Sequence, residues 1–296
     1  MKTNYEYRAD ARAALKGKWG PAILVTLLAS LPSLIAQAVA SSLNSPMADV
    51  IYRYLYAAYY QDTVYELTDL VKALSSTVTT GTYVAAGLAV AAFVLLPFLN
   101  LGFLHHTLHL MRGESAEVGD VLSRRHIIGK AIGESLLKWL IILGWGLLGV
   151  AGMYGLLTLG LMTQNTYIAE LMGFAGSVLY FFLLFRAVLT YFLADYLMAD
   201  RPETGVVESL RRSRTMMTGS RSRLGGLLFS FIGWSILCMA ATAAADMISV
   251  FVGTMVSMLG QLVLNLYVIT TASGFYLEMT RKNEGMEFEV SKEKQL

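Results

Sequence analysis

The sequence predicts an all-α membrane protein: a polytopic helical bundle of six transmembrane helices with amphipathic helices at the membrane interface. Two observations lead to this fold class. Hydrophobic residues make up 55% of the 296-residue chain and charged residues only 15%, whereas soluble chains carry about 25% charged residues. The chain also contains six apolar runs of the length that a helix needs to cross a hydrocarbon layer about 30 Å thick.

The six predicted spans are separated by polar or charged segments. Pro21 suits the first turn of the first span, where its missing N–H costs nothing, and Asp246 marks a tight turn before the sixth. The first run is longer than the apolar core of a signal peptide, so we expect it to be retained. The spans are expected at residues 21–40, 83–104, 136–162, 171–198, 224–245 and 250–277.

The basic residues predict the orientation of the spans. Of the 23 Lys and Arg residues, 20 fall on one side of the predicted topology, Arg53 and Lys72 fall on the other, and Arg186 lies within the fourth span. Because cytoplasmic loops carry an excess of Lys and Arg, both termini are expected in the cytoplasm. Residues 1–20 then form an interfacial helix, residues 21–280 a single membrane domain, and residues 281–296 a mobile tail.

The external segment, residues 41–81, is rich in tyrosine. Its apolar residues recur at steps of three and four, which predicts two amphipathic helices over the outer face of the protein. The tyrosines suit the headgroup level of the membrane. An alternative is that their rings stack against an external ligand.

Three basic segments, each with a glycine, precede the first, third and fifth spans. The glycines are Gly17, Gly129 and Gly219, and the repeat predicts three units, each with an interfacial helix, a glycine break and a two-span hairpin. The alternative is that every span needs a basic inner flank. The best-formed helix is expected at residues 203–217, with its apolar face in the headgroup layer and a Glu208–Arg212 pair on its other side.

Arginines of the loop between the fourth and fifth spans are candidates for contacts with lipid headgroups or a partner, since each basic residue near an anionic surface contributes about 1 kcal/mol. Their alternative role is to set the topology. The candidates are Arg211, Arg212, Arg214, Arg221 and Arg223.

Four stretches resemble a known family. They are residues 11–20 (ARAALKGKWG), 191–202 (YFLADYLMADRP), 213–219 (SRTMMTG) and 228–234 (LFSFIGW), and they are similar to the signature of the bacterial membrane family known as domain of unknown function 975. The resemblance covers most of the chain and implies a multi-span protein of the bacterial cytoplasmic membrane, without implying catalytic residues. The signature positions are Asp195, Gly219, Ser230, Phe231, Gly233 and Trp234.

Arg186 is a basic residue well inside a span, whereas Lys138 lies near the start of the third span. Arginine at the centre of a span costs about 2.5–3.5 kcal/mol on insertion scales, so a polar partner in the bundle is expected. We predict a polar patch of Arg186 with Asn100 and Asn265. The patch either binds an anionic headgroup or a carboxylate, or locks the helices together.

Histidines end the second span. His105 and His109 are four residues apart, a spacing that can hold a metal with Glu114 or Glu117 as a third ligand. Histidines at an interface are more often headgroup neighbours, and the HExxH pattern of metalloproteases is absent, so we expect no metal and no other cofactor. No nucleophile elbow or phosphate loop is present, and Cys238 is expected to pack within the fifth span.

The sequence therefore favours a non-enzymatic membrane protein that binds or senses a lipid-like or amphiphilic ligand, or serves as an accessory subunit. Its expected partners are membrane lipids, with another membrane protein as the alternative; the near balance of 23 basic and 21 acidic residues argues against nucleic acid. Two alternatives stay open: a secondary transporter of a small or amphiphilic solute, and an integral-membrane enzyme that acts on lipid.

Overall fold

The computed structural model describes residues 2–60, 67–76 and 80–293, and throughout these ranges the regular structure is helical, without strands. Within them, six segments are long and apolar enough to cross a membrane. The predicted all-helical class and the six spans are confirmed. The segments are Trp19–Val39, Thr82–Arg112, Val118–Met162, Thr166–Asp200, Arg221–Asp246 and Val250–Gly285.

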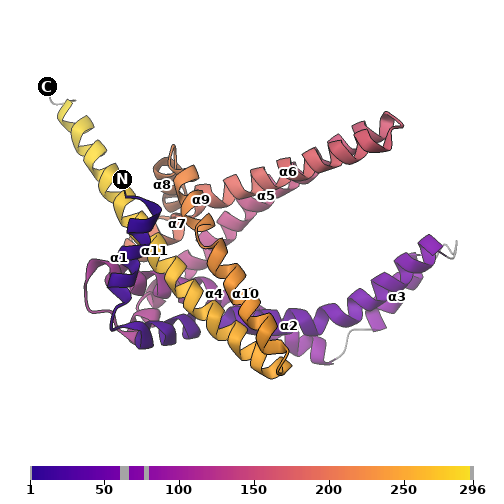
Figure 1. Ribbon diagram of the computed structural model, residues 1–296, viewed down its shortest axis with the longest axis horizontal. Helices are drawn as coiled ribbons and strands as arrows, with labels where there is room; N and C mark the ends of the chain where they lie inside the picture. The colour runs from indigo at the N-terminus through magenta and orange to yellow at the C-terminus, as the bar shows by residue number, and fades with distance from the viewer. Residues whose placement is uncertain (1, 61–66, 77–79, 294–296) are drawn as a thin grey trace.

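The long helices pair into three antiparallel hairpins, which spread apart from a common end of the molecule (Figure 1). The middle hairpin is the most closely packed because glycines let its two backbones approach. A Cβ on Gly160 would lie 2.7 Å from Ala169 Cα, and one on Gly176 would lie 2.8 Å from Met153 Cα. The pairs are α2 (Trp19–Tyr60) with α4 (Thr80–Arg112), α5 (Ile128–Met162) with α6 (Thr166–Tyr191), and α10 (Ile232–Asp246) with α11 (Val250–Glu293).

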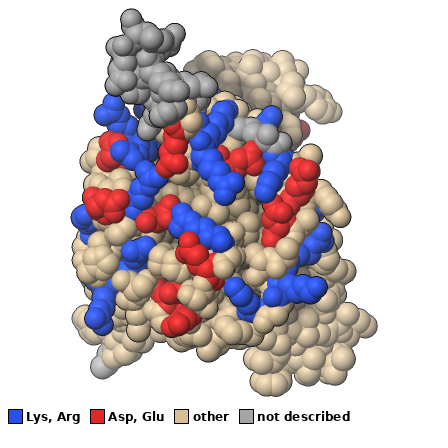
Figure 2. All heavy atoms as spheres, turned by 90° about the vertical axis from the view of Figure 1, so that its left-hand side faces the viewer, with Lys and Arg blue, Asp and Glu red and all other residues tan. Residues whose placement is uncertain are grey.

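Short helices gather at the end where the hairpins meet. This end carries α1 and the C-terminal part of α11 (Figure 1), and Figure 2 shows basic and acidic side chains interleaved over its surface; we refer to it as the charged end. Beneath it lies the main apolar core, in which Tyr196, Phe275 and Tyr276 are among the largest fully buried side chains. The short helices are α1 (Asn4–Leu15), η1 (Val118–Leu122), η2 (Arg125–Ile127), α7 (Ala194–Asp200), α8 (Val206–Met216) and α9 (Arg221–Phe229), while α3 (Leu67–Ser76) follows α2.

Two of the three predicted glycine breaks are present. Gly17 follows α1 with φ +77°, and Gly219 follows α8 with φ +76°, a backbone conformation that glycine adopts without a steric cost. The prediction for Gly129 is wrong, since this residue lies inside α5. The chain before α5 is instead turned by Gly113, which has φ +75° directly after α4.

Helix boundaries differ from the prediction at four places. The helix of the first span runs on to Tyr60, and that of the sixth continues to Glu293, where a mobile tail was expected. The family-like stretches coincide with two interruptions, at residues 192–193 between α6 and α7 and at residues 230–231 between α9 and α10. Of the external segment, α2 and α3 are described as helix, but most of its tyrosine side chains lie outside what the structure describes.

The helix predicted at residues 203–217 is present as α8, and its Glu208–Arg212 pair is confirmed, with Arg212 Nε 2.6 Å from Glu208 Oε1. Its orientation differs from the prediction. Leu210 and Met216 are buried within the protein, where α8 packs against α5, α6 and α7. The larger part of its apolar face is therefore covered by neighbouring helices and does not lie in the headgroup layer.

Candidate functional site

Three arginines from three different helices line one small cavity near the charged end. The cavity has a volume of about 260 Å³, and we call it the arginine pocket. Arg186 comes from α6, Arg214 from α8 and Arg221 from the first turn of α9. The remaining lining residues are Trp145 of α5 and Ala187, Thr190 and Tyr191 of α6.

Local contacts explain why α8 and α9 meet α6 at this place. The buried Ser213 hydroxyl donates a hydrogen bond of 2.9 Å to the Thr190 carbonyl, which fixes α8 on α6 one residue before Arg214. Gly219 then turns the chain into α9. A Cβ on Gly225 would lie 3.4 Å from side-chain atoms of α6, so this glycine lets α9 lie close to α6 and brings Arg221 to the pocket.

The charges of the pocket are uncompensated. No acidic residue lines it, and among the described residues neither Arg186, Arg214 nor Arg221 forms an ion pair. Nε of Arg221 is buried without a hydrogen-bond partner, although a buried polar atom normally has one. Arg186 and Arg214 are exposed. The arrangement suits an anion such as a phosphate or carboxylate, because the planar guanidinium presents paired donors to such groups.

The structure does not bring Arg186 together with its predicted partners. α6 packs mainly against α5, α8 and α9, whereas Asn100 lies on α4 and Asn265 on α11. No hydrogen bond joins the three residues in the described part of the chain. Arg186 instead lies near the end of α6, where two arginines of the following loop reach it.

The five candidate arginines of that loop divide into two groups. Arg214 and Arg221 line the pocket, and sequence reasoning had named them without linking them to Arg186. Arg211 and Arg223 are exposed elsewhere, and Arg212 is paired with Glu208. The link could not be read from the sequence because it depends on the turn at Gly219 and on how α8 packs.

Asp195, a family-signature position, belongs to a buried ionic cluster. Its carboxylate accepts a hydrogen bond from Lys138 Nζ, and Glu134 Oε2 lies 3.8 Å from the same ammonium group. Only 13% of the Lys138 side chain and 1% of the Glu134 side chain are exposed. Sequence reasoning had missed this role of Glu134 and Lys138. Their spacing of four residues on one helix was the available signal.

The other signature positions lie around the interruption between α9 and α10, except Gly219, which turns the chain after α8. The Ser230 carbonyl accepts a hydrogen bond of 3.4 Å from Arg8 Nη1, and the buried Phe231 ring packs edge-on against Tyr267, 5.2 Å between centroids. Both contacts connect this interruption to the neighbouring helices α1 and α11. Gly233 has open space at its Cβ position, and Trp234 is 48% exposed.

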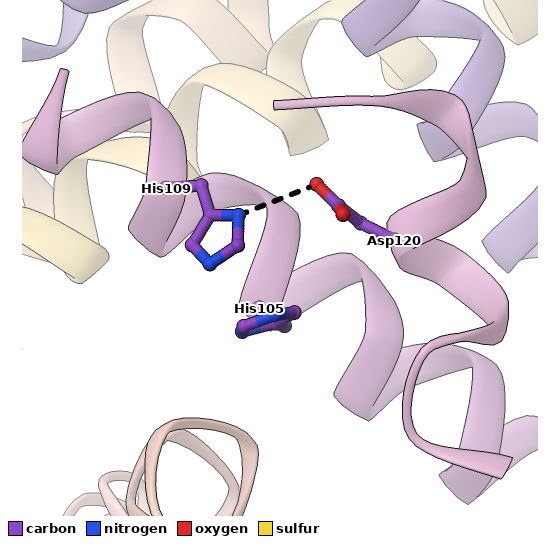
Figure 3. Close-up of side chains that lie close together, drawn as sticks. All are labelled: His105, His109 and Asp120. Carbon is purple, nitrogen blue, oxygen red and sulfur yellow. Dashed lines mark ion pairs between the residues drawn. The ribbon is translucent and has the colours of Figure 1, made fainter. Parts of the chain in front are cut away.

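His105 and His109 lie together, but with a third residue that sequence reasoning did not name. Asp120 of η1 approaches both, as Figure 3 shows. Of the two predicted third ligands, Glu114 lies 3.4 Å from His109 Nε2. Glu117 contributes backbone groups: its carbonyl lies 3.1 Å from His106 Nδ1, and its N–H donates a hydrogen bond of 3.1 Å to Asp120 Oδ2. Asp120 was missed because its position depends on the fold of the loop after α4.

A larger groove opens between α2, α10 and α11, with a volume of about 1190 Å³. Asn265 and Gln261 line it together with Cys238, which is partly buried. Hydroxyl groups are numerous along its walls. They belong to Ser30, Ser33, Ser235, Thr242, Thr254 and Ser257.

Comparison with known proteins gives one match. The sequence pattern of the family described as protein of unknown function (DUF975) matches residues 1–283. No curated protein and no solved structure matches the chain.

Proposed function

The chain belongs to the DUF975 family, and from that premise we propose that this multi-pass membrane protein is a non-enzymatic binder of an anionic amphiphile. The observation that carries the proposal is the arginine pocket, where three guanidinium groups converge without an acidic neighbour. The ligand class is a lipid-like molecule whose headgroup contains a phosphate. We place the charged end on the cytoplasmic side of a bacterial cytoplasmic membrane, in line with the distribution of basic residues.

The size of the pocket supports a headgroup as its occupant. Sites for whole drug-sized ligands span about 300–1,000 Å³, whereas this cavity has about 260 Å³. A phosphate group fits there, and the acyl chains of the same molecule would lie outside. Trp145 is 39% exposed beside the pocket, and Phe185 on α6 is 38% exposed, so apolar surface for the chains lies next to the arginines.

Position along α6 supports the same conclusion. Arg186 lies five residues before the end of α6, close to the charged end. Arginine near a membrane boundary costs less than arginine at the centre of a span. An anionic headgroup at that depth would compensate the charges of Arg186, Arg214 and Arg221 together.

The experiment is native mass spectrometry of the protein released from nanodiscs that contain equal amounts of an anionic phospholipid and a zwitterionic one. We expect the wild type to retain the anionic lipid selectively. Arg186→Gln and Arg221→Gln should each lower that retention at least about tenfold, since a hydrogen bond to a charged group contributes about 1.5–3 kcal/mol. Arg211→Gln is the matched control, because it removes the same charge from an exposed position of α8.

Two results would contradict the proposal. One is a wild type that retains both lipids equally. The other is an equal loss of anionic lipid in Arg211→Gln and Arg186→Gln, which would indicate general surface attraction and no defined pocket.

Transport of an amphiphile is the second candidate, and the groove between α2, α10 and α11 favours it. Polar walls among apolar spans suit a solute that carries both polar and apolar parts. Gln261→Leu and Asn265→Leu should then abolish uptake of a labelled amphiphile into vesicles, while Arg211→Gln leaves it intact. Uptake that is unchanged in both groove variants would exclude this route.

A further inference from the structure

We propose that His105, His109 and Asp120 form a binding site for one divalent transition-metal ion of the zinc type, which fastens the loop after α4 to that helix. The proposal is independent of the arginine pocket. The three side chains each offer a ligand atom, and these atoms lie within 4.8 Å of one another. Two ligand atoms of a tetrahedral zinc ion lie about 3.4 Å apart, given bonds of about 2.1 Å. Side-chain movements of about 1.5 Å or less therefore bring the three ligand atoms to that spacing.

The two histidines are held on one face of α4. They are one helical turn apart, and their ring centroids are separated by 4.0 Å. Nδ1 of His109 is buried and makes no hydrogen bond, yet it lies 3.5 Å from Asp120 Oδ2 (Figure 3). A buried nitrogen without a partner that faces a carboxylate is well placed to share a cation with it.

Glu114 lies at the other nitrogen of the His109 ring. Its Oε2 is 3.4 Å from His109 Nε2. When Nε2 carries the ring proton, the Nδ1 lone pair is free for a metal. Carboxylates commonly direct metal-binding histidines in this way.

Asp120 is held in place by the loop itself. Its Oδ2 accepts a hydrogen bond of 3.1 Å from the Glu117 backbone N–H and lies 3.3 Å from Nδ1 of the buried His106. Gly102 of α4 allows this arrangement, because a Cβ there would collide with the Val121 backbone of η1. The loop thus lies directly on α4, and a metal bound to residues of both would fix it there.

Arg124 is a competing cation at the same site. Its Nη2 donates a hydrogen bond of 3.0 Å to His105 Nδ1, while its Nε is buried without a partner. The positive charge next to His105 opposes metal binding. Removal of this guanidinium should therefore strengthen metal binding at the site.

The experiment is a titration of tag-free protein in detergent with Co²⁺ alone, followed by visible absorption, and then by displacement with Zn²⁺. We expect one equivalent to bind with the intense bands of a four-coordinate ion. His105→Ala, His109→Ala and Asp120→Asn should each abolish those bands. His126→Ala is the matched control, because His126 is exposed on η2 outside the cluster. Arg124→Gln should raise the affinity at least about tenfold, since a charge next to a titratable ligand changes its equilibria by about 1–3 log units.

Three results of this titration would overturn the proposal. A wild type without the bands overturns the proposal, as do bands that persist in the His105 or His109 variants. Asp120→Asn preserves the shape of the side chain, so its loss of bands does not depend on misfolding. An Arg124→Gln variant that binds no more tightly than wild type would also overturn the site as drawn.

Discussion

Replacement of Lys138 by Met tests the buried ionic cluster on α5 and α7. The substitution keeps the length of the side chain but leaves Glu134 and Asp195 without their shared cation. Only 1% of Glu134 and 20% of Asp195 are exposed, so water compensates little of the loss. Breaking a buried ion pair by removal of one partner costs about 3–5 kcal/mol. At about 2–4 °C per kcal/mol, we expect the midpoint of thermal unfolding to fall by about 10 °C or more.

The assay uses the chain's single cysteine. Cys238 lies in α10 and is partly buried, so a thiol-reactive fluorophore reports the temperature at which the fold opens in detergent. The triple variant Lys138→Met, Glu134→Gln, Asp195→Asn is the control, because it removes all three charges together. We expect it to regain most of the lost stability. A single variant as stable as wild type, or a triple variant no better than the single one, would refute the reasoning.

Three further predictions concern the charged end. Gly219→Ala should lower the free energy of unfolding by about 1–2 kcal/mol, because residue 219 has a left-handed backbone conformation. No clash adds to this cost, since no atom lies within 4 Å of the new Cβ. The control is Gly129→Ala, which also has open space at the Cβ but lies in a helix, and it should be nearly neutral in the same thermal assay. Gly102→Ala should expose the loop after α4 to limited proteolysis, since the new methyl meets the backbone of η1. Hydrogen bonds from Thr3 lower the pKa of Glu6 from its ordinary 4.5. The cap of α1 therefore stabilises the helix fully above pH 4.5, and this stabilisation is lost as pH falls through the lowered pKa. The protection factors of the α1 amides, which correct exchange for its intrinsic pH dependence, should fall in acid, and by less in Glu6→Gln.

The spans and their pairing could be predicted because they depend on local composition. Six apolar runs define six helices whatever their packing, and short connections make consecutive helices neighbours. The Glu208–Arg212 pair was predictable for the same reason, since residues four apart on a helix always face each other. The break at Gly129 failed because residue types alone do not determine a backbone angle.

The sites could be predicted only in part, since each combines a local pattern with a distant contact. The spacing of His105 and His109 was evident, but Asp120 joins them only through the folded loop. The sequence identified Arg186 as a residue whose charge costs free energy within a span. Its neighbours in the arginine pocket come from α8 and α9, and the sequence does not show that these helices fold back onto α6. The family resemblance indicated Asp195, whereas its contact with Lys138 depends on where the folded chain places α7 relative to α5.

The arrangement of the hairpins bears on how a bound anion would act. The described spans are largely unburied within the chain, with at most 28% of an apolar window buried, and the main apolar core lies at the charged end. The arginine pocket joins the α5–α6 hairpin to α8 and α9, which lead into the α10–α11 hairpin. An anion held by Arg186 and Arg221 therefore contacts both units at once. If its affinity depends on the angle between these hairpins, binding must shift that angle. If the anion binds equally well at every angle, the populations of the different angles stay the same, however tightly the anion binds.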